Sequence, residues 1–165
     1  MTLIIGIKCR DGILMQSDTK FTDESGFHIE YAVKLFPIFI GEKAPFIIGL
    51  SGQKDVFHDA HRIVTKQFQT IKNEFSSLYC ENLLKKCRDL MYREFNVIPQ
   101  KRKGIKENGD GVSLDCLFAG FMLENKKLIP QIYNFNPYTS PMPYDYLATE
   151  NEKKCLVKEV MTTYL

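Results

Sequence analysis

The chain has 165 residues, which is the length of one domain with a single core. Hydrophobic residues make up 44% and charged residues 25%, a composition that excludes an intrinsically disordered chain. The net charge of +2 does not favour a nucleic acid or an anionic membrane as partner. No apolar run reaches the roughly 18 residues that cross a bilayer, and the start lacks the basic leader of a secretory signal. We therefore expect a soluble, cytoplasmic protein.

The chain begins with short apolar runs that predict four strands: residues 3–8, 13–17, 27–39 and 45–51. Asp11-Gly12 indicates a tight hairpin turn between the first two strands, because glycine accepts the positive φ that such a turn needs. Residues 41–45 are predicted to form the turn between the last two.

The apolar spacing then becomes helical and predicts two consecutive helices, at residues 54–71 and 77–95. The basic, glycine-rich segment 100–111 follows them. We interpret it as a solvated loop rather than a nucleic-acid site. Two helices in a row must lay their apolar faces on the preceding sheet, so the order of elements predicts an α+β layered domain.

The last third of the chain is predicted to begin with a hairpin. Its strands are residues 112–123 and 128–135, which turn at residues 124–127. A segment rich in proline and tyrosine, 136–146, leads to a predicted final helix at residues 150–164.

The five cysteines are Cys9, Cys80, Cys87, Cys116 and Cys155. Their odd number, their wide spacing and the absence of a C-x-x-C pair predict neither a disulfide framework nor a zinc site. Cys80 and Cys87 stand seven residues apart on a predicted helix and so share one face. We interpret them as buried apolar groups rather than as a redox pair.

The second residue, Thr2, is a candidate nucleophile. Because the initiator methionine is commonly removed when a small residue follows it, the mature chain would begin at Thr2. An N-terminal threonine combines a hydroxyl with a free α-amine whose ordinary pKa is about 7.7–8.0. That amine can act as general base near neutral pH without a histidine.

Asp18 and Lys34 are predicted to support Thr2. Asp18 ends the strand that pairs with the first one, and Lys34 lies between apolar residues of the next strand. A buried lysine needs a carboxylate partner, and Asp18 is its natural one. Beside Thr2, the Lys34 ammonium would lower the pKa of the α-amine and favour the reactive form of the nucleophile. The alternative is an ordinary surface ion pair, which contributes little.

Three stretches of the chain resemble the proteasome β-type subunits, which are N-terminal-nucleophile hydrolases. They are residues 2–19 (TLIIGIKCRDGILMQSDT), residues 33–35 (VKL) and residues 48–52 (IGLSG) ahead of a helix. The resemblance rests on these motifs over residues 2–70 and on the order of elements beyond them.

The resemblance implies that Thr2 is nucleophile and base, with Asp18 and Lys34 as the supporting pair. It further implies that the backbone N–H of Gly52 donates to the developing oxyanion. The family carries Gly-Ser-Gly before its third helix, where this chain has LATEN at residues 147–151. Thr149 would then supply the hydroxyl, without the flanking glycines.

The resemblance also implies a substrate pocket on either side of Lys34 and after Gly52. Its residues would be Phe21, Ala32, Phe36, Leu50 and Lys54. A lysine in the pocket would favour an acidic substrate residue, although a lysine at the start of a helix ordinarily points to solvent.

The fold implied by the resemblance is a four-layer αββα sandwich of antiparallel sheets, with residues 1–165 as one domain. Relatives continue past the third helix with another helix and two strands, whereas this sequence stops at Leu165. We therefore expect the C-terminal elements of the family to be missing, and one sheet edge to need cover from a neighbouring chain. The implied partners are a polypeptide substrate, identical subunits in a ring and an ATP-dependent unfoldase, with no cofactor.

The function predicted in this way is a threonine-type endopeptidase. Two alternatives stay open: a non-catalytic scaffold or assembly subunit, and a transpeptidase or ligase in which an amine accepts the acyl group. His58 and His61 stand three apart on a predicted helix but lack a third metal ligand, and His28 is isolated. No metal site is predicted, and the sequence has no phosphate-binding loop.

Overall fold

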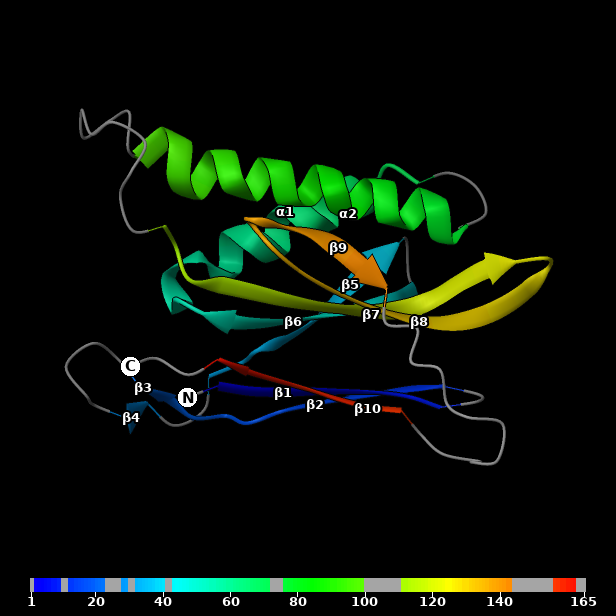
Figure 1. Ribbon diagram of the computed structural model, residues 1–165, viewed down its shortest axis with the longest axis horizontal. Helices are drawn as coiled ribbons and strands as arrows, with labels where there is room; N and C mark the ends of the chain where they lie inside the picture. The colour runs from blue at the N-terminus through cyan, green and yellow to red at the C-terminus, as the bar shows by residue number, and fades with distance from the viewer. Residues whose placement is uncertain are drawn as a thin grey trace.

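The computed structural model describes residues 2–9, 12–22, 28–29, 32–40, 43–71, 76–99, 111–143 and 156–162. In these ranges two helices, a five-stranded sheet and a three-stranded sheet are stacked in three layers, with the five-stranded sheet in the middle (Figure 1). A small two-stranded ribbon consists of β3 (Phe21–Thr22) and β4 (His28–Ile29). Within the same ranges, no helix combines the length and the apolar character needed to cross a membrane.

The five-stranded sheet is antiparallel throughout, in the order β5-β6-β7-β8-β9. Its strands are β5 (Leu35–Ile40), β6 (Lys43–Gly52), β7 (Leu114–Glu124), β8 (Lys127–Asn136) and β9 (Thr139–Pro143). The predicted β7–β8 hairpin is confirmed. Its two turn residues, Asn125 and Lys126, have φ of 49° and 65°, as a two-residue turn of this hand requires. Strand β9 was not predicted; its prolines restrict it to the edge of the sheet.

The three-stranded sheet has the order β10-β1-β2, with β1 (Thr2–Lys8) between β2 (Ile13–Ser17) and β10 (Leu156–Thr162). Strand β10 pairs with β1 along its whole length, from Lys8 opposite Leu156 to Thr2 opposite Thr162. The predicted helix at residues 150–164 is therefore wrong. The segment is rich in β-branched residues and supplies the partner that the second edge of β1 requires.

The single strand predicted at residues 27–39 is also wrong, because β4 and β5 belong to different sheets. Between these two strands the backbone hydrogen bonds pass from one sheet to the other. The Ala32 N–H donates to the Thr19 carbonyl (2.9 Å), and the Lys34 carbonyl accepts from the Leu50 N–H (2.9 Å). The predicted fourth layer depended on the final helix, and in the described part of the chain no helix covers the outer face of the three-stranded sheet.

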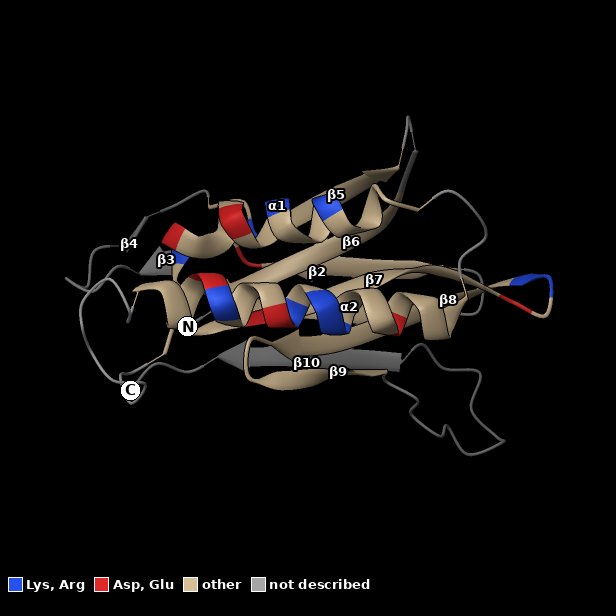
Figure 2. Ribbon diagram, turned by 90° about the horizontal axis from the view of Figure 1, so that it is seen from above, with Lys and Arg blue, Asp and Glu red and all other residues tan. Residues whose placement is uncertain are grey.

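Both predicted helices are confirmed. A short 3-10 turn, η1 (Lys54–Val56), leads into α1 (Phe57–Phe68), and α2 (Ser77–Tyr92) continues into a π-helical segment, η2 (Arg93–Val97). The Ser76 hydroxyl caps α2 by accepting the Tyr79 N–H at 3.2 Å. Figure 2 shows the two helices side by side over the five-stranded sheet, with their charged residues on the outward surface.

Below the helices lies the larger of two cores. It centres on the rings of Phe46, Phe68 and Phe118, whose centroids are 4.8–5.3 Å apart. Cys80 and Cys87 are fully buried in this core with free thiols, as predicted. Burial is the main cause that raises the pKa of the Cys87 thiol to about 12.

A second, smaller core separates the two sheets: Ile4, Leu117, Ala119 and Ile132. Glycines allow the sheets to approach closely here. A Cβ atom on Gly49 would lie 2.9 Å from Ile4 Cγ2, and one on Gly6 would lie 3.0 Å from Leu117 Cδ2. Strand β7 is buried on both faces, because Phe118 points into the helix-side core while Leu117 points between the sheets.

Candidate active site at the start of strand β1

The start of β1 lies at one end of the space between the two sheets. Thr2 is the first residue of this strand and is paired with Thr162 of β10. Ile4, two residues further on, packs on Gly49 of the five-stranded sheet. Hydrogen bonds link the start of β1 to Asp18 after β2, Asp18 to Lys34 before β5, and Lys34 to Leu50 near the end of β6, so four segments of the chain meet at this end.

Lys34 and Asp18 form an ion pair at this end. Lys34 Nζ lies 2.7 Å from Asp18 Oδ1, and it also donates to the Lys20 carbonyl. The Lys34 side chain is 0% exposed, whereas that of Asp18 is 29% exposed. A buried ammonium group is tolerated only when acceptors take its protons, and the carboxylate and the carbonyl serve this purpose. The Lys20 carbonyl was not foreseen from the sequence.

Asp18 also holds the residue that follows Thr2. The Leu3 N–H donates to Asp18 Oδ1 at 3.0 Å, and the Asp18 N–H donates to the Leu3 carbonyl at 3.1 Å. One carboxylate oxygen therefore accepts from both the buried Lys34 ammonium and the backbone of β1. This shared oxygen fixes the start of β1 relative to a buried positive charge.

Gly52 ends β6 with a φ of +126°, which favours glycine. A Cβ atom here would lie 2.1 Å from the Ser113 carbonyl oxygen, so no other residue fits without a shift of the backbone. The Gln53 N–H donates to that same carbonyl at 2.8 Å. Two residues before Gly52 on the same strand, the Leu50 N–H donates to the Lys34 carbonyl. Because alternate N–H groups of a strand point to the same side, the Gly52 N–H points toward the Lys34 side of β6.

The five predicted pocket residues have different surroundings. Phe21 lies in β3, Ala32 is buried before β5, and Lys54 is exposed in η1. Leu50 is fully buried in the helix-side core, and the partly buried Phe36 packs against the same core. Their assignment to a pocket stays a prediction, while the packing already gives Phe36 and Leu50 a structural role. Thr149 falls outside the described residues.

A polar row on the inner face of the five-stranded sheet was missed from the sequence. Ser51 is fully buried and lies directly opposite Asp115, whose Oδ1 accepts from Asn136 Nδ2 at 3.1 Å. The row crosses β6, β7 and β8 beside Gly52. A signal was available, because strand alternation places Asp115 on the same face as the buried Leu117.

The described part of the chain contains no group of three or more His, Cys, Asp and Glu side chains that could hold a metal ion. The His61 ring stacks on Phe36, with centroids 5.1 Å apart, and its Nε2 lies 3.1 Å from the Pro37 carbonyl oxygen. His58 is exposed on α1. What this end of the fold offers chemically is a buried ammonium paired with a carboxylate that also holds the backbone of β1, together with a glycine of fixed conformation at the end of β6.

No family model matches the sequence, and no curated protein matches it. The fold is similar to that of a solved structure, a Gly-1 mutant of Anbu from Hyphomicrobium sp. strain MC1. The TM-score is 0.61 and the sequence identity 11%, and the match covers 99% of this chain. The chain spans 60% of the length of that Anbu chain.

These comparisons correct the family assignment made from the sequence. Membership of the proteasome β-type subunits is wrong as an identification, because the sequence matches no family model and the likeness at 11% identity is one of fold. The motifs around Thr2, Asp18 and Lys34 therefore do not by themselves show that the chain belongs to that family. The chain has an α+β fold, and its likeness to the Anbu structure is one of fold alone.

Proposed function

We propose that the chain is a peptide-bond hydrolase whose nucleophile is the hydroxyl of Thr2, exposed at the N-terminus after removal of Met1. The observation that carries the proposal is the shared oxygen of Asp18. It accepts from Lys34 Nζ at 2.7 Å and from the Leu3 N–H at 3.0 Å. A buried cation is thereby held at the residue next to Thr2, where it would favour the neutral form of the α-amine.

The reaction would proceed in two steps. In the first, Thr2 Oγ bonds to the substrate carbonyl carbon while its proton passes to the Thr2 α-amine. The C–N bond then breaks, and the departing amine takes that proton. In the second, the α-amine accepts a proton from water, whose oxygen attacks the ester carbon. The C–Oγ bond then breaks, the α-ammonium returns the proton to Thr2 Oγ, and the acid is released. The Gly52 N–H would donate to the oxyanion in both steps, since its backbone is fixed before charge develops.

Replacing Thr2 tests this proposal most directly. We expect the protein with Met1 removed to cleave peptides. Thr2→Ala should reduce kcat by about 10³-fold or more, because the hydroxyl that attacks the substrate is lost. Thr2→Ser, which keeps a hydroxyl, should retain part of the activity. Intact mass would first establish that Thr2 is the N-terminus, and an acylating probe should add to Thr2 alone.

Thr70→Ala is a matched control, since it removes an exposed hydroxyl at the end of α1 that donates only to the Gln67 carbonyl. It should leave kcat and KM unchanged. Persistent cleavage or probe labelling in Thr2→Ala would overturn the proposal. Retained Met1 would block the α-amine and support the scaffold alternative, while products joined to an added amine would support the transpeptidase alternative. A ring of identical subunits and an ATP-dependent unfoldase stay predictions.

A further inference from the structure

We infer that a clamp of three residues, Asn96, Tyr138 and Asn136, positions the Gly52 peptide for the reaction at Thr2. The inference deepens the proposed function and rests on it. None of these residues lies in the segments that carry the motifs around Thr2. Ser113 links the clamp to Gly52: its carbonyl accepts the Gln53 N–H at 2.8 Å and would collide with any Cβ atom on Gly52. The place of Ser113 therefore decides where the Gly52 peptide lies.

The first half of the clamp acts on the residue before Ser113. Asn96 lies in the π-helical segment η2 and is 5% exposed. Its Oδ1 accepts from the Val112 N–H at 3.2 Å. The Nδ2 of Asn96 is buried and has no hydrogen-bond partner among the described residues, which costs free energy. Asn96 thus holds the approach to β7 through its Oδ1.

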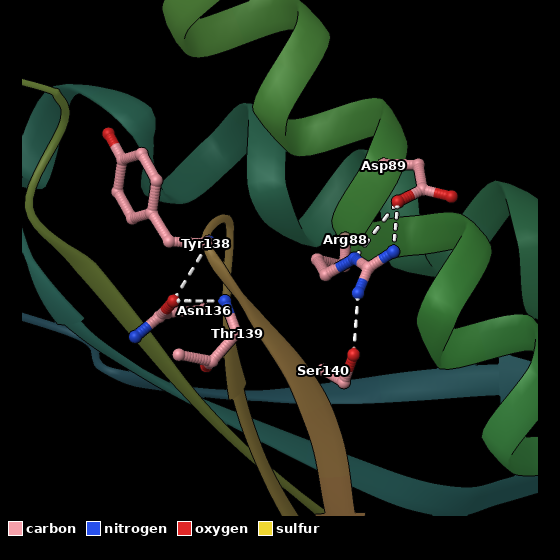
Figure 3. A network of polar contacts seen from close by, with 6 residues as sticks. All are labelled: Arg88, Asp89, Asn136, Tyr138, Thr139 and Ser140. Atoms are coloured by element: carbon pink, nitrogen blue, oxygen red, sulfur yellow. Dashed lines mark hydrogen bonds and ion pairs between the residues drawn. The ribbon is translucent and has the colours of Figure 1, made fainter.

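The second half acts on the other side of Ser113. The β7–β8 backbone ladder ends at Cys116 opposite Phe135, and the next contact is between side chains. Asn136 Nδ2 donates to Asp115 Oδ1 at 3.1 Å, on the face of the sheet that carries Ser51. The orientation of the Asn136 amide is fixed, because its Oδ1 accepts from the Tyr138 and Thr139 N–H groups, both at 2.8 Å (Figure 3).

Tyr138 joins the two halves. Its backbone N–H donates to Asn136, and its hydroxyl donates to Asn96 Oδ1 at 2.6 Å. Gly111 leaves room for this contact, since a Cβ atom there would lie 1.5 Å from the Tyr138 oxygen. Partial burial is the main cause that raises the pKa of Tyr138, so its hydroxyl keeps the proton that it donates. A second tie holds the same turn to α2, where Arg88 donates to Ser140 Oγ at 2.7 Å (Figure 3).

The variant Tyr138→Phe tests the clamp by removing one hydroxyl. The residue is 51% exposed, so the fold tolerates the change. We expect the Gln53 amide to exchange its hydrogen about 2- to 10-fold faster, since its acceptor on Ser113 is less well held. The exchange of Leu84, buried in the helix-side core, should stay the same. In the active enzyme kcat should fall by a similar factor while KM is unchanged, because the Gly52 N–H serves the transition state.

Tyr92→Phe is the matched control. Its ring packs on that of Tyr138, with centroids 5.9 Å apart, and it is 41% exposed. It should change neither the Gln53 exchange rate nor kcat. The inference is overturned if Tyr138→Phe leaves Gln53 exchange unchanged, accelerates Leu84 equally, or leaves kcat unchanged in an active enzyme. An inactive wild-type enzyme would overturn the proposed function and the catalytic purpose of the clamp, whereas the exchange rates test the clamp itself.

Discussion

The two faces of the five-stranded sheet are built for different tasks. The face under the helices is closed by large apolar side chains, with Phe46, Phe68 and Phe118 in mutual contact. The face toward the three-stranded sheet carries a much smaller core, and the sheets meet there through glycines. At the Thr2 end this second face becomes polar, with Lys34 and Ser51 fully buried.

This difference shows on which face of such a sheet buried polar groups can be accommodated. On the helix side, burial of a core made mostly of apolar side chains stabilises the fold. Buried charges on the other face are tolerated only with complete sets of acceptors, which also fix the backbone around them. The main apolar core and the buried ion pair thus lie on opposite faces of the five-stranded sheet.

The largest loss of stability should come from removing one partner of the Lys34–Asp18 ion pair, and it should depend on which partner is removed. Asp18→Ala leaves the Lys34 ammonium buried without its carboxylate, and we expect a loss of about 3–5 kcal/mol in the free energy of unfolding. Lys34→Met leaves Asp18 partly hydrated and still bonded to the Leu3 N–H, so the loss should be smaller, about 1–3 kcal/mol. Urea unfolding measures both. Equal losses would mean that water reaches the ammonium.

A smaller effect should follow from forcing the sheets apart. Gly49→Ala places a methyl group 2.9 Å from Ile4 Cγ2 and 3.2 Å from Leu35 Cδ2, and overpacking of this kind costs about 1–3 kcal/mol. Ile4→Ala in the same protein removes both Cγ2 and Cδ1, the Ile4 atoms nearest the new methyl group, so the double variant should lose less than the sum of the two single losses. Gly12→Ala, with no atom within 4 Å of the new methyl group, should change stability by less than about 0.5 kcal/mol. A double variant whose loss equals the sum of the two single losses would count against close contact between the sheets.

The smallest perturbation is a test of how closed the helix-side core is. Burial raises the pKa of the Cys80, Cys87 and Cys116 thiols, so almost no thiolate exists at pH 8. We expect these three thiols to react with maleimide only after unfolding in urea, as read from labelled peptides by mass spectrometry. Rapid labelling of the folded protein would show that the helices open readily.

The same shift predicts how stability depends on pH. The pKa of Cys87 is about 12 in the folded protein against 9.0 for the ordinary thiol. Its contribution to stability is therefore fully present below pH 9 and is lost as the pH rises toward 12. A midpoint of urea unfolding that does not fall across this range would contradict the burial of the thiol.

Local patterns predicted much of the fold. The helical spacing after residue 54 and the two-residue turn at Asn125 and Lys126 were recognisable because their signals lie within a few residues of one another. The contact between Lys34 and Asp18 could also be predicted, since a lysine among apolar residues has to find a carboxylate.

The remaining features depend on distant contacts. Residues 156–162 are extended because they pair with β1, which helical periodicity at the end of the chain could not reveal. The clamp joins Asn96 to Tyr138 across 42 positions, and neither residue belongs to a periodic pattern. Part of the predicted pocket faces the helix-side core. Side chains alternate along β6, so Leu50 points to the face of the sheet under the helices while Gly49 faces the other sheet.

The pairing of β10 with β1 sets a constraint on how the protein folds. Residues 2–8 are made well before residues 156–162, and one of their edges stays unpaired until the later segment has emerged from the ribosome. Closing a loop of this length is slow compared with forming a helix or a hairpin. The strand that carries Thr2 is thus completed late, after the five-stranded sheet and its helices can already have assembled. Under the proposed function, the site at Thr2 would be complete only after β10 has docked on β1.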